Sequence, residues 1–93
     1  MRVFRLVGVM SLAASAAAAE PPAGAASCSG CHPASAKADT PVPPIRGRDA
    51  AEITTAMQQF RSGERPATVM GRIAKGFTDN EIQAIGAWLA SER

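Results

Sequence analysis

The sequence predicts a small all-α domain of three helices joined by long loops. Apolar residues recur at spacings of three and four in two segments of the 93-residue chain, 50–61 and 78–91, as in a helix with one buried face. No segment alternates apolar and polar residues for long enough to form a strand. Prolines cluster between the helical segments, so the connections are irregular, and loops of this length are usually functional.

The first predicted helix covers about 22–31. It begins at Pro22, where the missing backbone N–H is not needed, although Gly24 lowers its helix propensity. Four prolines then keep the segment 33–48 from forming a regular helix or a central strand. We therefore expect a long loop between the first helix and the second.

The second predicted helix spans 50–61. Asp49 precedes it as an N-cap, and Gly63 follows it as a stop signal. Its buried face has residues at spacings of four and three, namely Ile53, Met57 and Phe60. The next segment, 64–76, is punctuated by a proline and two glycines, which predicts irregular structure.

The third predicted helix opens at Thr78, which forms a capping box with Glu81, and extends to about Ser91. Its inner face has apolar and small residues at helical spacing, with Trp88 beside them: Ile82, Ile85, Gly86 and Leu89. This helix completes the all-α domain.

Residues 1–19 have the pattern of a secretory signal peptide. Arg2 and Arg5 give a basic start, an apolar run follows, and small residues end at Ala19. We expect cleavage after Ala19, which leaves one domain, 20–93, in the periplasm. An uncleaved membrane anchor is the weaker alternative, because the apolar run is short of the ~20 residues that span a bilayer.

Net charge gives no reason to expect nucleic acid or a membrane surface as a partner. The chain has ten Lys and Arg residues against eight Asp and Glu residues, but Arg2 and Arg5 belong to the signal peptide. The exported domain therefore carries eight of each sign. Electrostatic attraction to nucleic acid or to an anionic membrane is not predicted for such a domain.

The only two cysteines and the only histidine lie together in Cys28-Ser29-Gly30-Cys31-His32. A structural disulfide would close too small a loop to stabilise the domain and leaves His32 unexplained. A redox-active dithiol normally accompanies a βαβ pattern, and a structural zinc site needs four ligands where this motif offers three. C-x-x-C-H is the attachment sequence for c-type haem.

The haem interpretation uses every reactive residue of the motif. Cys28 and Cys31 form thioether bonds to the haem vinyl groups, and His32 is the proximal ligand of the iron. One covalent haem also supplies an apolar core, which matters because domains of this size usually need a disulfide, a metal or a partner for stability.

The second axial ligand is predicted to be Met70, because the domain has no second histidine. Met70 lies between Pro66 and Gly71, and a loop can present a thioether to the iron without disturbing a helix face. Met57 is the alternative, but it lies on the buried face of a predicted helix, where core packing explains it. Lys75 or water is a further alternative.

Two more expectations concern groups near the haem. The backbone of Pro43 or Pro44 accepts the other N–H of His32, or these prolines only stiffen the loop. Arg72 or Lys75 pairs with a haem propionate, or remains a solvated loop charge.

The attachment motif, the segment 43–45 and a methionine segment before a C-terminal helix resemble a class I cytochrome c. The match is closer to one branch, the cytochrome subunit of flavocytochrome c sulfide dehydrogenase. Three stretches carry it: "FRSG" at 60–63, "TVMGRIAKGF" at 68–77 and the helix over 78–88. The resemblance covers nearly the whole exported domain.

This resemblance implies a class I cytochrome c fold around one covalent haem. It implies attachment at Cys28 and Cys31, with His32 and Met70 as axial ligands. It also implies a partner, an FAD-containing flavoprotein that oxidises sulfide and passes electrons to this chain, which hands them to a downstream acceptor. The chain would then be an electron-transfer subunit and no enzyme by itself.

Two other functions remain open at this point. The chain is alternatively a free-standing periplasmic cytochrome c that shuttles electrons between larger complexes. A non-haem dithiol redox protein, built on Cys28 and Cys31, is the third interpretation.

Overall fold

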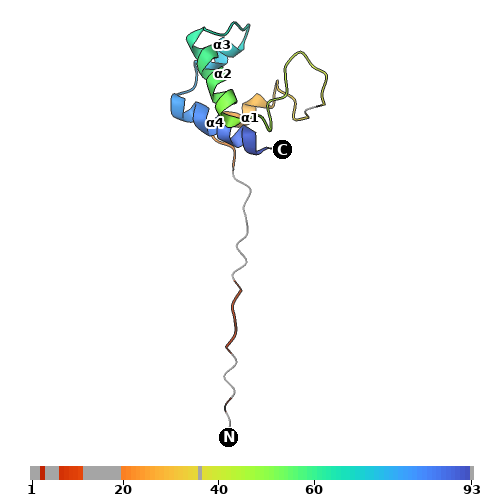
Figure 1. The fold of residues 1–93 in the computed structure, drawn as a ribbon, viewed down its shortest axis with the longest axis vertical. Helices are drawn as coiled ribbons and strands as arrows, with labels where there is room; N and C mark the ends of the chain where they lie inside the picture. Colours follow the sequence, from red (N-terminus) through yellow and green to blue (C-terminus); the bar gives the residue numbers. More distant parts are fainter. Residues whose placement is uncertain (1–2, 4–6, 12–19, 36, 93) are drawn as a thin grey trace.

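The protein folds into four helices, α1 (Ala25–Cys28), α2 (Ala50–Ser62), α3 (Met70–Ala74) and α4 (Asp79–Ser91) (Figure 1). The structure is a computed structural model that describes residues 3, 7–11, 20–35 and 37–92. Within these residues every regular element is a helix, and no strand occurs. The predicted all-α class is confirmed, with one helix more than the sequence predicted.

Helices α2 and α4 begin and end where their capping residues predict. The Asp49 carboxylate accepts a hydrogen bond from the backbone N–H of Glu52 (3.2 Å), and Gly63 ends α2 with a left-handed φ of 81°. Thr78 and Glu81 form the predicted capping box, with hydrogen bonds of 2.9 and 3.2 Å. Hydrogen bonding to the Glu81 carboxylate, chiefly from the backbone N–H of Thr78 and also from the Thr78 side chain, lowers the pKa of Glu81.

Helix α1 is shorter than the predicted 22–31. Gly24 has a left-handed φ of 82°, and a Cβ at this position would lie 2.5 Å from Cε1 of Phe77. The chain therefore turns tightly against an aromatic ring at Gly24, and regular helix starts only after it. Beyond Cys28, single helical turns continue as far as His32.

Helix α3 corrects the prediction that 64–76 is irregular. Two backbone hydrogen bonds to the carbonyl of Val69, from Arg72 (3.0 Å) and Ile73 (3.1 Å), start this short helix without any side-chain cap. Ala74 is fully buried, and α3 packs against α2. Packing against α2 accounts for a helix that is too short to be stable alone.

The core lies where α2 and α4 cross, with α3 and α1 closing its sides. Seven apolar side chains are buried in it: Ala25, Ile53, Met57, Ala74, Ile82, Ile85 and Leu89. All the residues predicted for the inner face of α4 are buried, and Trp88 is half-buried beside them. Phe60, predicted for the buried face of α2, is half-buried at the edge of the core.

Gly86 allows α4 to pack closely against the backbone of α2, because it has no side chain. A Cβ at this position would lie 2.8 Å from Oγ1 of Thr54 and 3.0 Å from the carbonyl oxygen of Ala50. Gly86→Ala is expected to lower the free energy of unfolding by about 1–3 kcal/mol, because the α2 backbone must move away. Chemical denaturation measures the loss. Ala87→Ser, at an exposed neighbouring position of α4, is the control and should change stability by less than about 0.5 kcal/mol; equal stability of both variants would contradict the close crossing.

The predicted signal peptide lies mostly outside the described residues, as does its cleavage site after Ala19. Of its described residues, Val7, Val9 and Met10 are more than four-fifths exposed, and 7–11 lie apart from the helical domain (Figure 1). In the described part of the chain, no helix has the length and apolarity required to cross a bilayer. The signal peptide stays a prediction.

Candidate cofactor site

One cavity of about 650 Å³ opens between the segment around α1, the proline loop, α2 and α3. Its volume is in the range of sites that hold drug-sized molecules and cofactors. Most of its walls are apolar, and the floor includes the core residues Ile53 and Met57. Cys28, Cys31, His32 and Met70, the four residues predicted to hold a haem, all line this cavity.

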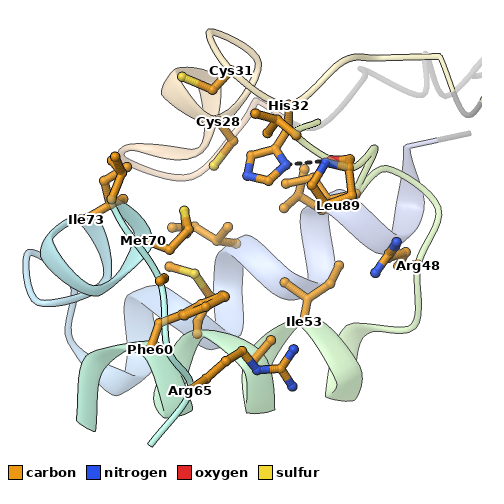
Figure 2. Close-up of a pocket in the computed structure, with 18 of the residues that line it drawn as sticks. Cys28, Cys31, His32, Arg48, Ile53, Phe60, Arg65, Met70, Ile73 and Leu89 are labelled. Atoms are coloured by element: carbon orange, nitrogen blue, oxygen red, sulfur yellow. Dashed lines mark hydrogen bonds between the residues drawn. The ribbon is translucent and has the colours of Figure 1, made fainter. Parts of the chain in front are cut away.

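The helical turn after α1 sets the geometry of the C-x-x-C-H motif. The backbone N–H of His32 donates to the carbonyl of Cys28 (2.8 Å), and the N–H of Cys31 donates to the same carbonyl (3.2 Å). Residues four apart on a helical turn share a face, so Cys28 and His32 both point into the cavity, as Figure 2 shows. Cys31 is exposed and lies at the outer rim of the cavity.

A hydrogen bond fixes the imidazole of His32. Its Nδ1 lies 2.6 Å from the carbonyl oxygen of Pro43 (Figure 2). Because a carbonyl only accepts, Nδ1–H is the donor, and Nε2 of the neutral ring keeps its lone pair for a metal. Of the two prolines considered from the sequence, Pro43 is the partner. Metal-binding histidines are commonly oriented by such a bond to a backbone carbonyl.

The two cysteines are free thiols, Cys28 half-buried and Cys31 exposed. Burial raises the pKa of the Cys28 thiol, although a backbone hydrogen bond partly opposes this effect. A raised pKa lowers the thiolate fraction at neutral pH, whereas redox-active cysteines have lowered pKa values. In the parts of the chain that the structure describes, no three His, Cys, Asp or Glu side chains gather as a metal site. The dithiol and zinc interpretations therefore gain no support.

Met70 is presented by a helix and not by a loop, contrary to the argument made from sequence. It is the first residue of α3, half-buried, and packs against the core (Figure 2). Met57 lines the same cavity from α2, but it is 8% exposed and belongs to the core. Lys75 is exposed and not among the lining residues. The helical start of α3 still aims the Met70 thioether into the cavity.

Neither of the two cations considered as partners of a haem propionate lines the cavity. Arg72 and Lys75 are exposed and lie off the cavity wall, whereas Arg48 and Arg65 line it. Sequence reasoning missed both arginines, because each lies in an irregular segment where periodicity does not indicate the direction of a side chain. The only weak signal for Arg48 was its place next to the N-cap of α2.

This set of donors fits a covalently attached haem. Two thiols at one end of the cavity suit thioether bonds, and an imidazole with a free Nε2 and a thioether suit the two axial positions. The walls are apolar, as a porphyrin ring requires, and two guanidinium groups are available for its carboxylates. The residues present therefore agree with the cofactor that the C-x-x-C-H motif predicts.

Comparison with known proteins gives two relatives, while no protein-family model matches the chain. Over 65 residues it is 40% identical to the cytochrome subunit of sulfide dehydrogenase of Chlorobaculum tepidum, which covers 70% of this chain and 59% of that protein. Over 68 residues it is 32% identical to the thiosulfate dehydrogenase electron acceptor of Stutzerimonas stutzeri, which covers 69% of this chain and 32% of that protein. The chain thus spans less than two thirds of either relative.

These relatives confirm one prediction and agree with another. The resemblance to the cytochrome subunit of a sulfide dehydrogenase is shown by the first of them. One relative is named as the cytochrome subunit of a dehydrogenase and the other as the electron acceptor of one, which agrees with the expectation of an electron-transfer chain. A cytochrome carries haem, so a haem-type cofactor is consistent with both the kinship and the cavity.

Proposed function

We propose, from the kinship of this chain to the cytochrome subunit of a sulfide dehydrogenase, that it is an electron-transferring monohaem c-type cytochrome. The observation that carries the proposal is the fixed imidazole of His32. Its Nδ1–H is bound to Pro43, and its ring points into an apolar cavity beside the Cys28 thiol. An orienting bond of this kind prepares a histidine for a metal.

The residues of the cavity have separate roles in this proposal. Cys28 and Cys31 would hold one haem covalently, and His32 through Nε2 and Met70 through its sulfur would bind the iron. The bound haem supplies a one-electron couple at its iron. A thioether ligand from Met70 would raise the reduction potential and would favour electron transfer over oxygen chemistry.

The partner in this proposal is an FAD-containing sulfide dehydrogenase flavoprotein in the periplasm. Sulfide is oxidised at the partner's flavin, and this chain only accepts electrons and passes them to a downstream acceptor. Support comes from the resemblance in 60–63 and 68–77 and from the first relative, which is the cytochrome subunit of a sulfide dehydrogenase. The predicted signal peptide, removed after Ala19, supports the periplasmic location.

A free-standing cytochrome shuttle is the second candidate. The second relative supports it, because that protein is named as an electron acceptor and not as a subunit. The two candidates share the haem site and differ only in whether a permanent interface with a flavoprotein exists.

An absorption spectrum of the exported protein tests the haem site. The protein, produced with haem-attachment machinery present, is expected to be red and to titrate no free thiols. A dithiol protein would be colourless, and after reduction both of its thiols would react. Colourless protein under these conditions would overturn the proposal.

Co-purification tests the partner. A tagged version of the chain, expressed in its natural host, is expected to retain an untagged FAD-containing protein in stoichiometric amount. A red monomer that is reduced by many unrelated donors would favour the shuttle and count against the flavoprotein. Because colour is recorded in the same fractions, failure of the partner proposal is distinguishable from failure of the haem site.

A further inference from the structure

The charged side chains that face the cavity are unequally distributed. Besides the motif at Cys28 to His32, the titratable and charged residues of its lining are Arg48 from the proline loop, Glu52 from α2, and Arg65 from the segment before α3. Figure 2 shows Arg48 and Arg65 on the sides of the cavity that lie away from the two cysteines. A group attached at the cysteines therefore has its remote end near these two guanidinium groups.

Arg65 is held in place more firmly than an exposed arginine usually is. Its Nε and Nη2 both donate to Oε1 of Gln59, at 3.1 and 2.8 Å, and its backbone N–H donates to the Gln59 carbonyl at 3.2 Å. The guanidinium also lies over the ring of Phe60, 5.5 Å from the centroid. Gln59 and Phe60 are adjacent residues of α2, so the last full turn of that helix positions Arg65.

These contacts orient the Arg65 guanidinium but leave its charge uncompensated. Gln59 and Phe60 are neutral, and in the described part of the chain the only salt bridge joins Arg61 to Asp79. A guanidinium has five N–H donors, and Gln59 takes two of them, so three remain, including a pair on the Nη1–Nη2 edge. That pair is the fork with which arginine binds a carboxylate through two parallel hydrogen bonds.

We propose that Arg65 binds a propionate carboxylate of the haem, and that Gln59 and Phe60 are the residues that position it. This inference rests on the proposed haem site. A c-type haem is attached through its vinyl groups, and its two propionates lie on the other side of the ring. Two arginines against one carboxylate, Glu52, give these charged lining residues a net positive charge, which matches a dianionic group. Arg48 is the cation available to the second propionate.

The consequence is electrostatic. A positive charge held beside the ring disfavours the oxidised iron, which carries one more positive charge than the reduced iron, so Arg65 raises the midpoint potential. It also favours the ionised form of the propionate it binds, which lowers the pKa of that carboxyl group. Both effects require the haem, and neither is expected from an arginine that serves only to fold the loop.

The test compares variants of the haem-containing protein by spectroelectrochemistry over a range of pH. Arg65→Gln is expected to lower the midpoint potential and to move the pH-dependent step in potential upward by roughly 1–3 pH units, because the propionic acid loses its cationic partner. Arg65→Lys keeps the positive charge but lacks the two parallel N–H donors. Its midpoint potential and its pH-dependent step should lie between those of the wild type and those of Arg65→Gln. Gln59→Leu leaves Arg65 charged but unheld, and it should shift the potential in the same direction as Arg65→Gln, to a smaller extent.

Arg72→Gln is the matched control, because Arg72 is an exposed arginine that does not line the cavity. It should leave the pH-dependent step unchanged. Equal shifts of the midpoint potential in Arg65→Gln and Arg72→Gln would show that Arg65 acts only as a general surface charge, and would overturn the inference. An unaltered pH-dependent step in Arg65→Gln would overturn it as well. Both outcomes can be measured only on protein that contains haem. Colourless wild-type protein would instead overturn the proposed haem site.

Discussion

Protein in which serine replaces both Cys28 and Cys31 is expected to lose all its colour in acid acetone, whereas the unaltered protein stays red. Acid acetone denatures the chain and would break the proposed bonds from His32 and Met70 to iron, but it does not cleave a thioether. Both thiols line the cavity, and they lie one helical turn apart. Haem staining after denaturing electrophoresis gives the same comparison, with essentially complete loss of signal in the double variant.

The single variants and a neighbouring residue provide the controls. Cys28→Ser and Cys31→Ser each keep one attachment point and should retain stained haem. Ser29→Ala alters the same motif without touching a thiol, and it removes only a hydrogen bond from Arg46 (2.9 Å), so its colour should match the wild type. Release of haem from the unaltered protein would show that attachment is not covalent.

Helices α2 and α4 were predictable because local chemistry determines their ends. Asp49 and Thr78 cap their N-termini with side-chain hydrogen bonds, and Gly63 supplies the left-handed residue after α2. Helix α3 was not predictable in this way. Its N-cap, Val69, makes no side-chain hydrogen bond, and burial of Ala74 against α2 is a tertiary contact.

In the cavity too, local sequence predicts some features and tertiary contacts determine the others. The motif from Cys28 to His32 specifies its own chemistry, and its helical turn follows from spacing. Tertiary structure decided the rest, because the proline loop brings the carbonyl of Pro43 to His32 and the chain after α2 folds Arg65 back onto Gln59. Neither contact has a periodic signal in the sequence.

Met70→Leu is expected to abolish the weak charge-transfer band at the red end of the oxidised spectrum and to lower the midpoint potential. Leucine has about the volume of methionine but lacks the sulfur that would bind the iron. Both spectroscopic and redox effects would therefore come from the lost sulfur and not from altered packing. Met70 is half-buried at the start of α3 and faces the cavity, which lets its thioether reach a metal without leaving the core. Visible spectroscopy and a redox titration record the two effects.

Met57→Leu separates the two methionines that line the cavity. Met57 is 8% exposed and packed in the core, so its truncation to alanine would cost about 2–5 kcal/mol and confound the spectrum with unfolding. Leucine keeps the packing within about 1.5 kcal/mol and removes only the sulfur. The band should therefore persist in Met57→Leu and vanish in Met70→Leu, and the opposite result would move the second axial ligand from α3 to α2. The outcome is decisive because both substitutions preserve side-chain volume and differ only in which thioether is lost.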